Sequence, residues 1–197
     1  MNDFKFINGN DLNEKQLDDI ANLLFDTGYY EYASLKNKLN LSTKEFQKVQ
    51  TLKPYSNYTH VLINNDNEVV GFFIVGTKQQ FAEVEKNTPD WYRDDPELKA
   101  SLQKLIHYYV NETSDKDLVS YGIAINSKYR GQGVFKILNA QRAKLARQEG
   151  CTRIAFVVWE SNPAVQTFQH CGATINGEID LTNTAFKDKL LKCSFDL

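Results

Sequence analysis

The chain has 197 residues, which is enough for one domain with a sizeable hydrophobic core. Hydrophobic residues make up 42% of the chain and aromatic residues 12%, and this composition excludes an intrinsically disordered protein. The formal net charge of −2 argues against a general nucleic-acid-binding protein, so no nucleic-acid partner is expected.

Targeting and metal-binding patterns are missing from the sequence. No stretch approaches the roughly 20 apolar residues that cross a bilayer, and the start "MNDFKFINGND" does not resemble a signal peptide. The three cysteines are odd in number and form no CxxC pair, so reduced thiols in a cytoplasmic protein are expected. The histidines show no metal-ligand spacing, and we expect no metal and no membrane partner.

The first part of the chain predicts a strand, two helices and a hairpin. Asp3–Ile7 is β-rich, and "DLNEKQLDDIANLLFDTG" after it has apolar residues at helical spacing. "LSTKEFQKVQTL" predicts a second helix with a capping signal. Two β-rich runs then flank the turn-forming "NNDN" and predict a hairpin of Thr59–Ile63 with Glu68–Gly76.

The second part predicts an α/β arrangement. Residues 78–117 are too many for a hairpin loop, so this insert should carry its own structure, including a helix in "PELKASLQKLIHYYVNE". The elements expected after it are a strand at Asp117–Asn126, a long helix in "VFKILNAQRAKLARQEG", a strand in "CTRIAFVVWE", a short helix in "NPAVQTFQHCG", and strands in "ATINGEIDL" and "LLKCSFDL". We therefore predict a single α/β domain, 1–197, with a mixed, mostly antiparallel sheet, one parallel strand pair and helices on both faces.

The segment "NSKYRGQGVFKIL" places a glycine-rich turn between a predicted strand and a predicted helix. Backbone N–H groups at a helix start have no partner within the helix, and the helix dipole favours an anion there. Glycines let a ligand approach closely, and Arg130 offers either a positive charge or a structural pairing. The turn lacks the Lys-Ser/Thr of a Walker A loop and the third glycine of a dinucleotide fingerprint. It indicates a phosphate site, or else a tight turn with no ligand.

The region from "YGIAINSKYRGQG" to "ESNPAVQTFQHCGAT" resembles the acetyl-CoA-binding core of the GNAT N-acetyltransferase superfamily. The family motif is Arg/Gln-x-x-Gly-x-Gly/Ala, in which Arg130 and Gly133 fit and Phe135 stands where a small residue is usual. The resemblance covers Val119 to about Thr174, within a predicted acetyl-CoA-binding core of 117–174, and it extends to the first half through the order of its elements, with the Thr59–Gly76 hairpin as the best match.

This resemblance implies acetyl-CoA as co-substrate, with its pantetheine arm acting as a substitute strand between two parallel strands that separate. The backbone of Ile123, Ala124 and Ile125 would face that arm. The amides of Gly131, Gln132, Gly133, Val134 and Phe135, beside Arg130, would hold the diphosphate. Asn162 matches the family asparagine near the thiol, although an asparagine before proline is also typical of a helix N-cap.

The implied reaction is direct transfer of an acetyl group to a primary amine. The family commonly has a tyrosine where this chain has Phe168, and some members have a glutamate base where it has Val157. Another group or water would then supply the proton to the departing thiolate, or acid help is dispensable. Tyr121 and Glu160 are the candidate catalytic residues. Tyr121 also suits a packed aromatic on a central strand, and Glu160 a solvated carboxylate at a strand end.

The acceptor amine is expected opposite the cofactor, near the Thr27–Thr43 region and the insert. Tyrosines in the first and acidic residues in the second suit a cationic small molecule or peptide, although ordinary solvated loops look the same. His107 is a further insert residue that could face the acceptor or lie at the surface. The alternatives are a non-catalytic acyl-CoA-binding or sensing module and an unrelated phosphate-binding protein, and the resemblance leaves a homodimer open.

Overall fold

The computed structural model describes residues 4–26, 52–87, 96–184 and 186–197. The chain divides into two compact units, which are described one at a time. The first unit comprises Met1–Val75 and Gly122–Arg142, and the second comprises Gly76–Tyr121 and Ala143–Leu197. The whole Thr27–Thr43 region with its tyrosines, and the predicted second helix except Leu52, lie outside the described residues.

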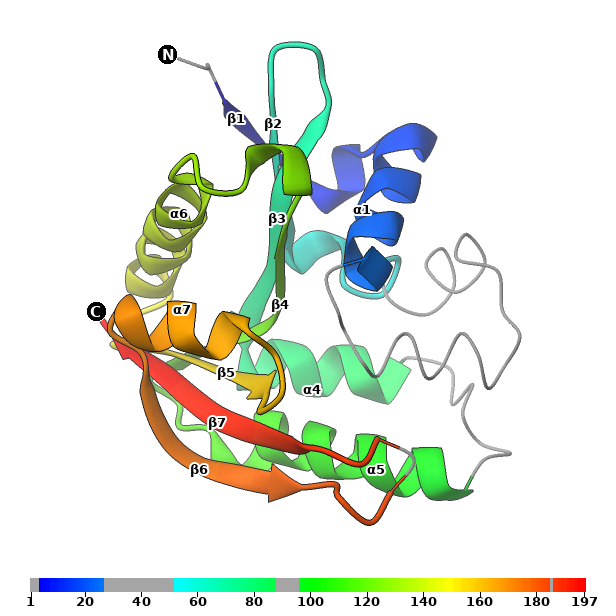
Figure 1. Cartoon of the computed structure of the whole chain (residues 1–197), viewed down its shortest axis with the longest axis vertical. Helices are drawn as coiled ribbons and strands as arrows, with labels where there is room; N and C mark the ends of the chain where they lie inside the picture. The colour runs from blue at the N-terminus through cyan, green and yellow to red at the C-terminus, as the bar shows by residue number, and fades with distance from the viewer. Residues whose placement is uncertain (1–3, 27–51, 88–95, 185) are drawn as a thin grey trace. The chain divides into compact units, whose positions relative to one another are not determined.

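The first unit contains an antiparallel sheet between two helices (Figure 1). Its strands are β1 (Lys5–Asn8), β2 (Thr59–Ile63), most of β3 (Val69–Thr77) and the end of β4 (Asp117–Ile125), and its helices are α1 (Glu14–Asp26) and the start of α6 (Val134–Gln148). Figure 1 shows α1 and the start of α6 on opposite sides of these strands. The apolar faces of these elements are almost wholly buried, as at Ile20, Phe72 and Leu138.

The start of α1 follows from a local sequence signal. Asn13 Oδ1 accepts from the Gln16 N–H at 2.9 Å, and Gln16 Oε1 accepts from the Asn13 N–H at 3.1 Å. These reciprocal bonds form a capping box, which satisfies N–H groups that the first helical turn leaves over.

The second unit builds on the start of β4. The described elements that complete it are α4 (Lys78–Asn87), α5 (Pro96–His107), a π-helical turn (Tyr108–Glu112), the end of α6, β5 (Arg153–Trp159), α7 (Ala164–His170), β6 (Thr174–Asp180) and β7 (Lys189–Asp196). Strand β5 pairs in parallel with β4 and antiparallel with β7, and β7 pairs antiparallel with β6. Figure 1 shows α7 on one side of this sheet and α5 on the other.

The seven strands follow the order β1-β2-β3-β4-β5-β7-β6, and this confirms the predicted mixed sheet with one parallel pair. The hairpin, the glycine turn between strand and helix, and the last strands all lie where the sequence pattern predicts them. The insert does carry structure, but two details differ. It contains α4 as a further helix, and the helix expected over 96–112 passes into the π-helical turn after His107.

Candidate functional site

The glycine turn lies in the first unit, between β4 and α6. Asn126 opens it, because its side chain accepts from the Lys128 N–H at 3.1 Å and starts a short 3-10 turn, Ser127–Tyr129. Gly131 and Gly133 then take φ values of 74° and 78°, a left-handed conformation that costs other residues energy. A side-chain Cβ built on either glycine would meet nothing within 4 Å, so the turn opens onto free space.

The backbone N–H groups of this turn give it the character of an anion site. Lys136 and Ile137 both donate to the Gly133 carbonyl, at 3.0 and 3.4 Å, and these are the first helix-type bonds of α6. Within the described chain, no protein acceptor was found for the N–H groups of Gly131, Gln132 or Val134. Donors at a helix start with no protein acceptor are suited to hold a phosphate group.

Side chains brace the same turn. Arg130 Nε donates to the Ile125 carbonyl at 3.2 Å, and Gln132 Nε2 donates to the Lys128 carbonyl at 2.8 Å. The Arg130 side chain is nevertheless exposed. Both roles predicted for Arg130 are therefore compatible with the geometry, since one guanidinium nitrogen binds the strand end while the group remains accessible.

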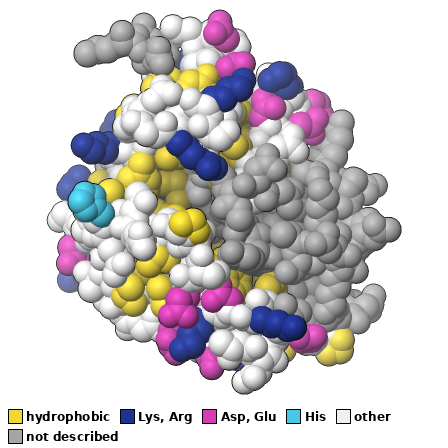
Figure 2. Space-filling view, in the orientation of Figure 1, with side chains coloured by type: hydrophobic (Ala, Val, Ile, Leu, Met, Phe, Trp, Pro, Cys, Tyr) yellow, Lys and Arg dark blue, Asp and Glu magenta, His cyan; other side chains and the backbone are white. Residues whose placement is uncertain are grey.

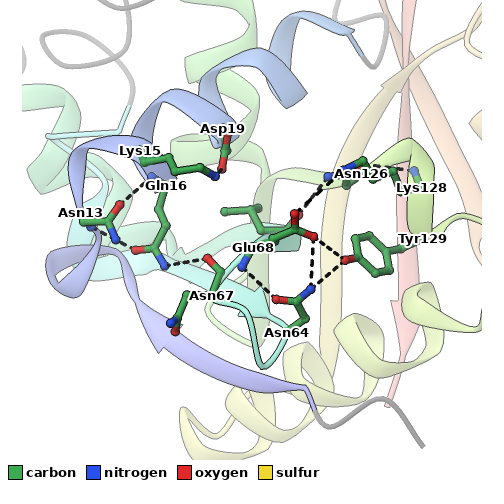
Figure 3. A network of polar contacts seen from close by, with 11 residues as sticks. Asn13, Lys15, Gln16, Asp19, Asn64, Asn67, Glu68, Asn126, Lys128 and Tyr129 are labelled. Carbon is green, nitrogen blue, oxygen red and sulfur yellow. Dashed lines mark hydrogen bonds and ion pairs between the residues drawn. The ribbon is translucent and has the colours of Figure 1, made fainter.

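A polar network joins the turn to the β2–β3 hairpin (Figure 3). The Tyr129 hydroxyl donates to Glu68 Oε2 at 3.0 Å and accepts from Asn64 Nδ2 at 2.9 Å, and Lys128 Nζ lies 4.0 Å from Glu68 Oε1. The hydrogen bond from Tyr129, followed by the charge of Lys128, lowers the pKa of Glu68. Burial and the hydrogen bond to Glu68 raise the pKa of Tyr129.

Sequence reasoning missed Asn64, Glu68 and Tyr129 as residues of this site. The sequence pattern marks Asn64 only as part of a turn-forming "NNDN", and Tyr129 only as the residue before Arg130. Their contact spans 61 residues of sequence between Glu68 and Tyr129. No local pattern signals such a pairing.

The end of β4 holds the three residues predicted to face pantetheine. In the parallel ladder Asp117–Ser120 pair with Arg153–Phe156, and β4 runs on to Ile125. Beyond it, the Asn126 N–H donates to the Val70 carbonyl at 2.9 Å, so the strand end is bound to β3. Ile123 and Ile125 are half-buried and Ala124 is buried.

In the second unit, Asn162 lies two residues before α7, the N-cap of which is Pro163. Its Oδ1 accepts from the Ala164 N–H at 2.9 Å, and its own N–H donates to the Trp159 carbonyl at 2.9 Å. Asn162 therefore braces the turn before α7, but the N-cap position that the sequence also suggested for it belongs to Pro163. Phe168, on α7, is 9% exposed and packs edge-on against Phe156 at 5.1 Å between ring centroids, so it contributes to the core.

The two candidate catalytic side chains have different surroundings. Tyr121 is half-buried in an aromatic cluster, with ring centroids 5.9 Å from Phe81 and 5.7 Å from Tyr109. Glu160 is exposed directly after β5, where its N–H donates to the Lys189 carbonyl at 2.9 Å. Tyr121 is thus a packed aromatic on a central strand, and Glu160 is a solvated carboxylate at a strand end.

A groove of about 540 Å³ lies between α5 and the strands β6 and β7. His107 lines it, with a side chain 63% exposed, beside acidic and basic residues that pair with one another, such as Lys192 with Glu112 at 2.5 Å. Figure 2 shows acidic and basic side chains gathered together near the lower edge of the view, where β6 ends. Glu178 at the groove pairs with Lys189 at 2.9 Å, so protein groups neutralise part of the charge at this groove.

Two features are missing from the part of the chain that the structure describes. No cluster of three or more histidine, cysteine, aspartate or glutamate side chains there has the arrangement of a metal site. None of the described helices has both the length and the apolar content of a membrane span.

Comparisons with known proteins agree with this geometry. A family model described as the Acetyltransferase (GNAT) family matches residues 25–173. Solved structures with the same fold include Ard1 from Thermoplasma volcanium, which is 10% identical with a TM-score of 0.58 over 98% of this chain and 97% of that one. A GCN5-related N-acetyltransferase from Kribbella flavida is 15% identical, with a TM-score of 0.57 over 98% of each chain.

Nourseothricin acetyltransferase is 20% identical with a TM-score of 0.46, and the match covers 70% of this chain and 64% of that one, too weak a likeness to carry an argument. A search of curated proteins found no match. The family model spans most of the chain, and this match excludes the alternative of an unrelated phosphate-binding protein. The chain belongs to the Acetyltransferase (GNAT) family of N-acetyltransferase enzymes.

Proposed function

We propose that the chain transfers the acetyl group of acetyl-CoA directly to a primary amine on a small molecule or peptide, acting in the cytoplasm as one domain. The observation that supports this best is the glycine turn. Its N–H groups at Gly131, Gln132 and Val134 have no described protein acceptor, and the space in front of both glycines is open. A diphosphate supplies the acceptor oxygens that such donors need.

The residues around the turn fit an acyl-CoA substrate. Arg130 adds positive charge beside the amides of Gly131 to Phe135, which would hold the diphosphate. Backbone groups of Ile123, Ala124 and Ile125 would pair with the amide groups of the pantetheine arm, as in the family. Acetyl-CoA itself supplies the activated thioester.

The thioester end of the substrate needs an oxyanion donor, which a backbone N–H between Ile123 and Ile125 would provide. By resemblance to the family, Asn162 and Phe168 would line the cofactor near its sulfur. Phe168 cannot donate a proton, so the departing thiolate would take its proton from water or from another group.

The amine must lose a proton before it attacks. Glu160 is exposed at the end of β5 and could accept this proton directly or through water. Tyr121 is the second candidate. Glu160→Gln should lower kcat while leaving the Kd for CoA unchanged, and Tyr121→Phe should do so to a smaller extent. Glu178→Gln is a matched control, because Glu178 is an exposed carboxylate paired with Lys189 at 2.9 Å.

The decisive experiment incubates the protein with acetyl-CoA and a library of small amines and peptides, and searches for acetylated products by mass spectrometry. Calorimetric titration with CoA runs beside it. An acetylated amine with release of CoA supports the proposal and gives the acceptor for the kinetics above. Tight CoA binding without any product would contradict it and favour the non-catalytic acyl-CoA-binding module.

A further inference from the structure

The turn between β2 and β3 is closed by hydrogen bonds to the side chain and the backbone of Asn64. Asn64 Oδ1 accepts from the N–H groups of both Asp66 and Glu68 at 2.9 Å, and the Asn64 N–H donates to the Glu68 carbonyl at 3.1 Å. Asn67 occupies a left-handed conformation with φ of 60°, as tight turns of this type require. The hairpin turn, Asn64–Glu68, therefore has one well-defined shape.

Helix α1 fixes this hairpin turn from outside. Gln16 is 4% exposed, and its Nε2 donates to the Asn67 carbonyl at 3.3 Å while its Oε1 caps the helix (Figure 3). Because burial and two hydrogen bonds already restrict the Gln16 side chain, it can hold the hairpin turn in place without a further cost in side-chain entropy. The hairpin turn is thus anchored to the helix behind it.

The opposite side of the hairpin turn binds Tyr129. Figure 3 shows the Tyr129 hydroxyl between Glu68 and Asn64, which reach it from the hairpin turn. The Tyr129 ring also meets Phe4 edge-on, with centroids 6.2 Å apart. The contacts of the hydroxyl and of the ring together hold Tyr129 in place, immediately before Arg130 and the two glycines.

The glycine turn needs such an anchor. Glycine has the greatest conformational freedom of any residue type, and this turn has two, Gly131 and Gly133. The N–H groups of Gly131, Gln132 and Val134 have no protein acceptor among the described residues. If a loop becomes ordered only when its ligand binds, the conformational entropy lost in that ordering weakens the binding of the ligand. Helix α6 fixes the turn after Gly133, and Tyr129 fixes it before Gly131.

We propose that Tyr129, held by Glu68 and Asn64, is a positioning residue that preorganises the glycine turn for the diphosphate of acetyl-CoA. This inference rests on the proposed function. It assigns to the β2–β3 hairpin turn a part in cofactor affinity, although none of its side chains is placed against the cofactor. The effect should therefore concern the diphosphate and be the same with or without the 3′-phosphate.

The test uses the full chain and the variant Tyr129→Phe, which keeps the ring against Phe4 and removes both hydrogen bonds of the hydroxyl. Isothermal titration with CoA and with dephospho-CoA should give a Kd about fivefold higher than wild type for both ligands. Asp66→Asn is the control, because it removes a carboxylate from the same hairpin turn and leaves the bonds to Tyr129 in place. Its Kd should stay at the wild-type value.

A double-mutant cycle separates positioning from a general loss of stability. Glu68→Ala should raise the Kd for CoA in the wild-type background, and should raise it less in the Tyr129→Phe background, because the two residues share one hydrogen bond. Fully additive effects would contradict the inference, and so would an unchanged Kd in Tyr129→Phe or a loss confined to CoA. If wild-type protein binds neither CoA nor dephospho-CoA, the proposed function fails, and this inference fails with it.

Discussion

Asp117 and Arg153 stand at the beginning of the only parallel ladder among the described strands. Removal of the ion pair between them gives a quantitative test of the fold. The two residues are the first register pair of β4 and β5. The Asp117 side chain is 1% exposed and accepts from Arg153 Nε at 2.7 Å and from Arg153 Nη2 at 2.8 Å. It also accepts from the Ser114 N–H at 2.7 Å, so the buried carboxylate has three charge-assisted hydrogen bonds.

The substitution Asp117→Asn removes the charge and at least one of these bonds, with little change in shape. A hydrogen bond to a charged group contributes roughly 1.5–3 kcal/mol. The Arg153 side chain is 39% exposed, so water replaces part of what it loses and the contribution must be reduced. We expect the free energy of unfolding to fall by about 2 kcal/mol, which lowers Tm by roughly 4–8 °C in a chain of this size.

The assay is urea unfolding of wild type and variant, with Asp115→Asn as the matched control. Asp115 is likewise paired with a basic residue, since its carboxylate lies 2.9 Å from Lys78 Nζ, but the Asp115 side chain is 74% exposed. Because an exposed pair contributes little, this control should unfold like wild type. If Asp117→Asn were as harmless as Asp115→Asn, the argument from burial would be wrong.

The same pair predicts a pH dependence with a definite sign. Burial alone would raise the pKa of Asp117, but the hydrogen bonds from Arg153 and Ser114 outweigh it, and the net pKa lies below the ordinary value of 3.8. A lowered folded-state pKa means stability that is fully present above about pH 4 and is lost as the pH falls through the folded-state value. The difference between wild type and Asp117→Asn should therefore shrink below about pH 4, whereas a constant difference would refute the electrostatic explanation.

Three further outcomes are expected. Gly133→Ala should lower stability by about 1 kcal/mol, because alanine is strained at a φ of 78°, and should weaken CoA binding further by placing a methyl group in the open turn; calorimetry and unfolding curves check both effects. Of the three free thiols, exposed Cys171 should react fast with a thiol reagent at pH 8, whereas Cys151 and Cys193 should react only on unfolding, since burial raises the pKa of both and that of Cys193 to about 11. Phe168→Ala should destabilise the protein by about 3 kcal/mol in urea unfolding, because Phe168 is a buried core residue.

Much of the fold could be predicted because its signals are local. The hairpin has β-branched and aromatic runs on both sides of a turn-forming "NNDN", and β2 ends at Ile63 as predicted while β3 extends over Val69–Thr77. The glycine turn, the long helix after it and the following strand each have boundary residues that favour one structure. These patterns were sufficient to place the element order of the acetyltransferase core.

The missed features depend on contacts between distant residues. Asp117 and Arg153 are 36 positions apart, and Glu68 and Tyr129 are 61 apart, so neither pair leaves a periodic trace in the sequence. The π-helical turn after α5, "YYVNE", begins with the buried residues Tyr108 and Tyr109, and no local signal in the sequence separates it from the helix before it. Local propensity therefore describes the elements, and tertiary contacts decide how the candidate site is braced.

The environments of the candidate catalytic residues rank them. A general base must exchange its proton with solvent in every cycle, and an exposed carboxylate such as Glu160 can do so directly. Tyr121 is packed between Phe81 and Tyr109, which suits a structural aromatic more than a group that moves protons. Phe168 has no proton to give and lies in the core. If the chain uses a side-chain base from this set, Glu160→Gln must therefore lower kcat more than Tyr121→Phe does, and the reverse order would show that the aromatic cluster itself takes part in the reaction.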